Sequence, residues 1–196
     1  MALPQQYERY TWQDYLSWPE GERWELIQGV AYAMSPAPTT GHQRIVIELS
    51  RQFSNYLLGK PCEVLVAPFD LKLSPAADDD EPTVVQPDLA VTCRREIVTE
   101  QGIIGAPDLC IEVTSPGSVA ADRKRKFALY EKHGVPEYWI VESAGGILEI
   151  YRLDDSGRYA RIGAYGPGET ASPAALPELV IDLSLVFRDY SAQEAK

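Results

Sequence analysis

Apolar residues recur along this chain at two different spacings, and the change of spacing separates predicted helices from predicted strands. Over residues 41–58 they recur at helical intervals with charged residues between them, and glycine and proline follow soon after. A second helical pattern covers residues 118–133 and ends at Gly134. Strand-like runs cover residues 62–73, 84–93, 109–114 and 137–141. We therefore predict an α/β fold with a core in the order helix, three strands, helix, strand.

Shorter elements flank this core at both ends. Before it, Thr11 is a helix-start residue, and two strand-like runs around Gln28-Gly29 predict a tight hairpin. After it, runs at 147–153 and 159–165 enclose a turn sequence and predict a second hairpin, and a further run at 179–186 precedes a polar tail. Without repeats or a long linker, we expect one domain. Its parts are the core at 41–142, an N-terminal helix and hairpin at 11–34 and a C-terminal β appendage at 147–187, together spanning residues 1–196.

Composition narrows the class of protein. The chain has 196 residues, of which 45% are hydrophobic and 24% charged, as in ordinary soluble globular domains. No apolar run approaches the roughly 20 residues that cross a bilayer, and the polar N-terminus does not resemble a signal peptide. The three cysteines (Cys62, Cys93 and Cys110) are odd in number and lack metal-ligand spacing. We therefore expect buried free thiols in a cytoplasmic protein without membrane contact.

The formal net charge of −11 argues against a protein that coats nucleic acid nonspecifically, because phosphate contact needs a basic surface. It leaves open an enzyme that gathers its positive charge locally. The run Arg123-Lys124-Arg125-Lys126 is such a local group.

Two carboxylates stand inside strand-like apolar runs, where burial without a partner is costly. Strand alternation places Glu112 on the more polar face of its run, and Asp88 likewise on its own. If the two strands lie close together, both side chains could reach one divalent cation, which points to metal-dependent phosphodiester hydrolysis. Asp108 shares the face of Glu112 but lies four residues away, about 13 Å along a strand. It is therefore expected at a loop or strand start.

Several strings in this order resemble the PD-(D/E)XK nuclease superfamily and, more narrowly, a large bacterial family of restriction-endonuclease-like proteins of unknown biological role. The resemblance covers about residues 10 to 150. The strings are Trp24-Glu25-Leu26-Ile27 with Gly29, Met34-Ser35-Pro36 with His42, Gln86-Pro87-Asp88-Leu89, Gly105-Ala106-Pro107-Asp108-Leu109, Ile111-Glu112-Val113 with Ser115-Pro116, Asp122-Arg123 with Lys126, and Tyr138-Trp139-Ile140-Val141.

The resemblance implies a restriction-endonuclease-like core and a Mg²⁺-dependent endonuclease that acts on DNA, and it is compatible with a homodimer. Mg²⁺, or Mn²⁺ in its place, would be held by Asp88, Glu112 and the Val113 carbonyl. The superfamily's lysine is expected two residues after the acid, where this chain has Thr114. The narrower family's pattern suggests Lys126 instead, and a helical wheel independently places Lys126 beside the predicted apolar face. Two further residues are candidates, namely Glu25 for a second metal or a metal-bound water and His42 for phosphate.

Each candidate side chain also has a purely structural interpretation. These are a turn carboxylate bonded to backbone N–H groups for Asp88, a buried ion pair with Arg123 or Lys126 for Glu112, a surface pair with Asp122 for Lys126, a hairpin salt bridge for Glu25, and a helix cap or core-edge histidine for His42. The rival class is a catalytically silent binding or regulatory module with the same fold, which Thr114 and the net charge favour. Action on RNA or a small nucleotide also stays open.

Overall fold

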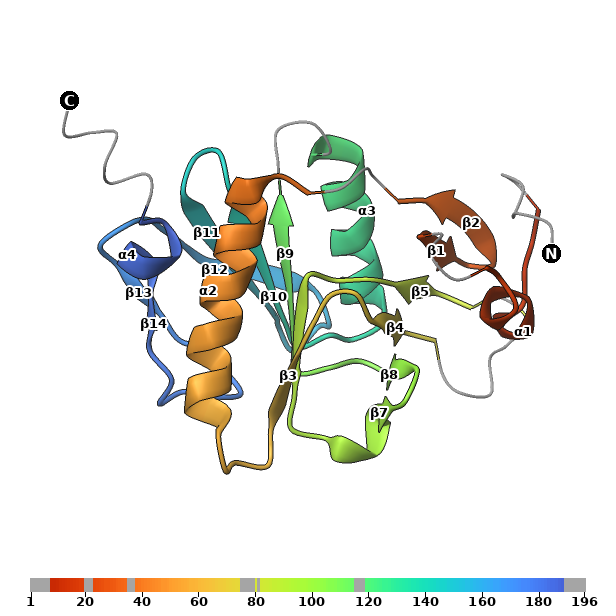
Figure 1. Cartoon of the computed structure of the whole chain (residues 1–196), viewed down its shortest axis with the longest axis horizontal. Coiled ribbons are helices and arrows are strands. Elements are labelled where there is room, and N and C mark those ends of the chain that lie inside the picture. Colours follow the sequence, from red (N-terminus) through yellow and green to blue (C-terminus); the bar gives the residue numbers. More distant parts are fainter. Residues whose placement is uncertain are drawn as a thin grey trace.

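A six-stranded sheet forms the middle layer of the molecule, between two long helices (Figure 1). The computed structural model describes residues 8–19, 23–34, 38–74, 80, 82–114 and 119–188, without the side chains of 119–122. In spatial order the sheet contains β12 (Tyr159–Tyr165), β11 (Ile147–Leu153), β10 (Glu137–Glu142), β9 (Leu109–Thr114), β6 (Leu89–Thr92) and β3 (Glu63–Val66). Only the β9–β10 pair of this sheet is parallel.

The helices α2 (Thr40–Leu57) and α3 (Val119–Lys132) cover opposite faces of this sheet, as the alternation along β9 shows. Ile111 packs in one buried cluster with Phe53 of α2, whereas Cys110 packs in another with Tyr130 of α3. Successive strand residues point to opposite faces, so a single strand serves both clusters. Both helices and the strands β9 and β10 confirm the order predicted from the sequence.

A second six-stranded sheet carries the N-terminal hairpin. In spatial order it contains β2 (Val30–Ala33), β1 (Trp24–Ile27), β5 (Val84–Val85), β4 (Asp70–Lys72), β8 (Gly102–Ile104) and β7 (Val98–Thr99). The predicted helix is α1 (Trp12–Leu16), which begins with a capping box between Thr11 and Asp14. A short 3₁₀ helix, η1 (Arg95–Ile97), precedes β7. Trp12 packs on this sheet against Leu26 and Val84.

Two runs that the sequence predicted as single strands are broken in the structure. Residues 62–73 form β3 and β4, with a cis Ala67–Pro68 peptide between them. Residues 84–93 form β5 and β6, with Gln86, Pro87 and Asp88 between them. Proline has no N–H for a strand ladder, which explains the second break. Each run therefore contributes to both sheets, and Asp88 lies at their junction instead of inside a strand.

The C-terminal hairpin has the predicted bounds, and its strands extend the main sheet beyond β10. The expected appendage is thus continuous with the core. After it comes β13 (Thr170–Ala171), and the closing run predicted at 179–186 contains both β14 (Ile181–Asp182) and the helix α4 (Leu183–Val186). Leu183 and Phe187 pack in the same buried cluster as Phe53 of α2.

The expectation of three free thiols is wrong. Cys62 and Cys93 form a disulfide, with 3.9 Å between their Cα atoms, and Cys110 is free and buried. Glu63 pairs with Thr92 in the β3–β6 register, so the next residues outward, Cys62 and Cys93, face each other. Sequence spacing alone does not reveal such a cross-strand pair. Within the described residues, no helix is long and apolar enough to cross a membrane.

Candidate active site at the junction of the two sheets

Asp88 joins the end of one central strand to the first turn of α2. Its Oδ2 atom accepts a hydrogen bond from the Val113 backbone N–H at 2.8 Å, at the end of β9. The same oxygen lies 3.1 Å from Nε2 of His42. Among the described residues, Oδ1 accepts no hydrogen bond, so one carboxylate oxygen of Asp88 is held and the other has no donor.

Glu112 has the same division between its two oxygens. Its Oε1 atom lies 2.9 Å from Nζ of Lys126 and accepts a hydrogen bond from the hydroxyl of Tyr130 at 2.7 Å. Both donors come from α3, because β9 turns Glu112 toward that helix. Among the described residues, Oε2 has no hydrogen-bond donor.

Lys126 points into the molecule, as the helical wheel predicted, and only 5% of it is exposed. Besides Glu112, its ammonium lies 3.2 Å from Oε1 of Glu25. Glu25 is also buried and accepts the backbone N–H of Gln86 at 3.3 Å. Lys126 therefore joins a carboxylate of the second sheet to a carboxylate of the main sheet.

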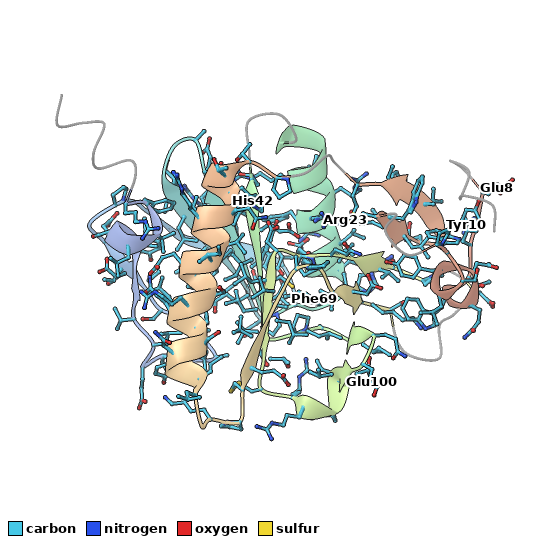
Figure 2. The ribbon with its side chains drawn as sticks, viewed as in Figure 1. Glu8, Tyr10, Arg23, His42, Phe69 and Glu100 are labelled. Carbon is cyan, nitrogen blue, oxygen red and sulfur yellow. A yellow bond between two sulfur atoms is a disulfide. The ribbon has the colours of Figure 1, made fainter. Side chains whose placement is uncertain are left out.

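His42 lies at the start of α2, near the upper end of that helix in Figure 2. The N-cap of this helix is Thr39, whose hydroxyl accepts the His42 backbone N–H. The His42 ring therefore does not cap the helix. Nε2 of the ring contacts Asp88, whereas Nδ1 is buried without a hydrogen-bond partner among the described residues.

The site carries more negative than positive charge. The pKa of Glu112 is raised to about 8, mainly by burial, with Lys126 lowering it and the nearby Asp88 charge raising it. One ammonium thus faces Glu25 and Glu112, with Asp88 close by. A proton or an added cation would relieve this imbalance.

The oxygen atoms left without donors fit a hard divalent cation, which takes carboxylate and carbonyl ligands. They are Oδ1 of Asp88 and Oε2 of Glu112. Val113 adds a carbonyl, because the N–H and C=O of an extended residue point to the same side, and the Val113 N–H points to Asp88. Continuing the β6–β9 register by two residues places Pro87 opposite Val113, and proline has no N–H to occupy that carbonyl. Within the described chain, no three His, Cys, Asp or Glu side chains form a complete metal cluster.

Comparison with known proteins identifies the family. The family model Uma2, described as "Putative restriction endonuclease", matches residues 12–184. The chain belongs to the Uma2 family. A relative, the uncharacterized protein slr1290 of Synechocystis sp., is 32% identical over 148 residues, which are 74% of this chain and 75% of that protein.

A crystal structure has the same fold as this Uma2 chain. It is described as a putative nuclease belonging to DUF820, from Anabaena variabilis, and superimposes with a TM-score of 0.70 at 19% identity. The match covers 91% of this chain and 97% of the other. The restriction-endonuclease-like fold predicted from the sequence is thereby confirmed.

Four polar residues of the site in this Uma2 chain were not singled out from the sequence, namely Tyr15, Asp70, Gln86 and Tyr130. Tyr130 is one helical turn beyond Lys126 and therefore shares its face, which the sequence could have revealed. The other three form a hydrogen-bonded chain across the second sheet, in which Tyr15 and Gln86 both donate to Oδ1 of Asp70. These hydrogen bonds depend on the breaks between β3 and β4 and between β5 and β6, which the apolar pattern did not predict.

Some of the purely structural roles considered for the candidate residues agree with the structure of this Uma2 chain, and others do not. Asp88 does accept a backbone N–H, and Glu112 does pair with Lys126, whereas Arg123 pairs with Glu149. Glu25 contacts α3 instead of a partner within its own hairpin. Asp108 precedes β9, as expected. The Asp122 side chain, Ser35-Pro36 and Ser115-Pro116 lie outside the described residues.

Proposed function

We propose that this Uma2-family chain is a Mg²⁺-dependent endonuclease that hydrolyses phosphodiester bonds of DNA. The observation that carries the proposal is the burial of Lys126 between Glu25 and Glu112 at the place where Asp88 joins the two sheets. The family description and the nuclease-like fold of a structural neighbour support the same reaction class.

Asp88, Glu112 and the Val113 carbonyl would hold Mg²⁺, with Mn²⁺ as a substitute. When bound, the ion would supply Lewis-acid chemistry, lowering the pKa of a bound water and neutralising charge on the scissile phosphate. The protein contributes the fixed orientation of the ligands. His42 and the Val113 N–H hold Asp88 by one oxygen, while Tyr130 and Lys126 hold Glu112 by one oxygen.

Lys126 would perform the role of the superfamily lysine, because the position where that lysine is expected holds Thr114. Its ammonium adjoins Glu112 and would orient the attacking water or stabilise negative charge on the phosphate. Glu25 keeps the ammonium at this position through its own contact. His42 would hold Asp88 through Nε2, and a phosphate contact through the buried Nδ1 would require the ring to become accessible when DNA binds.

The alternative of a silent binding module is less well supported. A silent module would be indicated by a Lys126 side chain that points to solvent, away from Asp88 and Glu112. Here Lys126 contacts Glu112 and Glu25. We further propose a homodimer, since cutting both strands of a duplex suits two copies of one site; action on DNA would place it in the cytoplasm, although the Cys62–Cys93 disulfide removes the free-thiol argument for that location. Light scattering tests the dimer, and a monomer would remove that part alone.

The test is cleavage of plasmid and linear DNA with purified protein in Mg²⁺ and in EDTA. We expect cleavage in Mg²⁺, none in EDTA, and none with Asp88→Ala or Glu112→Ala. The matched control is Asp155→Ala, which removes an exposed carboxylate in the β11–β12 turn. Cleavage that persists in the two site variants would sink the proposal.

A further inference from the structure

Arg23 is an exposed guanidinium beside the candidate site, and its partner is neutral. Its Nε and Nη2 atoms donate to Oε1 of Gln86 at 3.3 and 3.2 Å, and the described residues offer it no other hydrogen bond or ion pair. Several other arginines pair with carboxylates, as Arg51 does with Glu48 and Arg158 with Glu131, whereas Arg94 and Arg95 donate to backbone carbonyls. The charge of Arg23 is therefore oriented without being neutralised.

The amide that holds Arg23 is itself fixed in one orientation. Its Nε2 donates to Oδ1 of Asp70 at 2.9 Å, and the Tyr15 hydroxyl donates to the same oxygen at 2.7 Å. Burial and the Asp70 charge raise the pKa of Tyr15, so its hydroxyl remains a donor. Because Asp70 accepts from the amide nitrogen, the amide oxygen must face Arg23. Three half-buried groups thus determine where an exposed arginine lies.

Arg23 also has a defined place relative to the catalytic candidates. It stands two residues before Glu25, and its carbonyl accepts the Met34 N–H, which extends the β1–β2 pairing to this position. Residues two apart on a strand share a face and lie about 7 Å apart. Gln86 links the two directly, since its backbone N–H donates to Glu25. In Figure 2, Arg23 lies nearer the N-terminal hairpin than His42 does.

We propose that Arg23 binds a backbone phosphate of DNA adjacent to the scissile one, and that Gln86, Asp70 and Tyr15 position it for that contact. The inference rests on the proposed function, and it names the group that recognises the substrate outside the reacting centre. A guanidinium presents a planar fork of donors that matches two oxygens of one phosphate. Its separation from Glu25 places it beside the reacting phosphate instead of on it.

The test is fluorescence anisotropy with a labelled DNA duplex in EDTA, where no cleavage occurs. We expect Arg23→Ala to raise Kd about 10-fold, as loss of one charge-assisted contact does. It should also reduce the slope of log Kd against log salt concentration by about one. The matched control is Arg158→Ala, which removes the same charge beside the β11–β12 turn, where Arg158 is exposed and pairs with Glu131, and should change Kd less than about twofold.

Gln86→Met separates positioning from charge. It keeps the size of the side chain and the Arg23 charge but removes the oxygen that orients Arg23. We expect Kd to rise about threefold with an unchanged salt slope, because the phosphate contact persists in a less ordered form. An unchanged Kd in Gln86→Met beside a raised Kd in Arg23→Ala would overturn the positioning role.

Cleavage measured in parallel in Mg²⁺ separates this inference from the nuclease proposal. Wild-type cleavage together with unaltered DNA binding by Arg23→Ala would overturn the inference and leave the nuclease standing. Arg23-dependent binding without any wild-type cleavage would support the inference and sink the nuclease. A wild-type protein that neither binds nor cleaves DNA would overturn both.

Discussion

The chain contains two Pro-Asp pairs that form nearly the same local structure at opposite ends of neighbouring strands. Pro87-Asp88 precedes β6, and Asp88 accepts the N–H of Val113 at the end of β9 at 2.8 Å. Pro107-Asp108 precedes β9, and Asp108 accepts the N–H of Cys93 just after β6 at 2.7 Å. Because β6 and β9 are antiparallel, each aspartate closes the strand that the other begins.

The two ends differ in what packs around the aspartate. Asp88 also contacts His42, and Glu112 and Lys126 lie beside it. Asp108 lies beside the Cys62–Cys93 disulfide, and its side chain accepts only the Cys93 N–H within the described residues. A Pro-Asp pair is thus a device for ending a strand ladder. Candidate chemistry arises where α2, α3 and the N-terminal hairpin meet the same end of the sheet.

The largest difference should come from Lys126, which the Asp88 end has and the Asp108 end lacks. Lys126→Met leaves Glu25 and Glu112 buried without their ammonium, and loss of one partner from a buried pair costs about 3–5 kcal/mol. Lys124→Met, on the exposed side of the same helix, should change the free energy of unfolding by less than about 0.5 kcal/mol. Urea denaturation in EDTA measures both, and equal losses would contradict the buried pairing.

Activity should separate the two aspartates next. Asp88→Asn should lower the rate of DNA cleavage in Mg²⁺ at least about 100-fold, because even groups that only support metal ligands contribute 10- to 100-fold. Asp108→Asn should leave the rate within about twofold. Equal losses in the two variants would mean that Pro-Asp acts structurally at both ends.

The free energy of unfolding, unlike the cleavage rate, should change by similar amounts when either aspartate is replaced. Either aspartate changed to alanine leaves a backbone N–H of the sheet without its acceptor, which costs about 1–3 kcal/mol. We expect Asp88→Ala and Asp108→Ala to lower the free energy of unfolding by similar amounts in EDTA. A much larger loss for Asp108→Ala would show that the two turns are not equivalent in structure.

The last prediction concerns pH. The pKa of Glu112 is about 8 in the folded protein against an ordinary value of 4.5, mainly through burial. Between these values the folded protein keeps a proton that the unfolded chain has released, so raising the pH favours unfolding. Stability in EDTA should therefore fall as pH rises from about 4.5 to about 8, by at most about 1.4 kcal/mol per pH unit from this group. Glu112→Gln should flatten that part of the slope, and identical slopes would count against a raised pKa.

Most of the fold could be predicted from the sequence because its longest elements have regular apolar spacing. The bounds of α2, β11 and β12 follow that spacing closely. The strand breaks could not be predicted in the same way. Residues 62–73 remain apolar through Ala67-Pro68-Phe69, and residues 84–93 are apolar on both sides of Gln86-Pro87-Asp88, because each run passes from one buried sheet directly into another. Only Pro68 and Pro87 mark the change, and proline also occurs at intact strand ends.

The candidate site was predicted in part for a related reason. Glu112 and Lys126 stand out because each is charged beside an apolar face, and the structure brings both to one point. Arg23, Asp70 and Gln86 are ordinary polar residues in the sequence. Their connection depends on how β1, β4 and β5 lie beside one another, and on a register that local patterns do not encode. The Cys62–Cys93 pair escaped prediction for the same reason.

The most direct test of a shared metal site is calorimetric titration of Mn²⁺ into the wild type, Asp88→Asn, Glu112→Gln and Asp108→Asn. We predict one site in the wild type and in Asp108→Asn, and no binding in the other two variants, because Asp88 and Glu112 would hold a single ion. Undiminished binding in Asp88→Asn or Glu112→Gln would contradict a site shared by these two carboxylates.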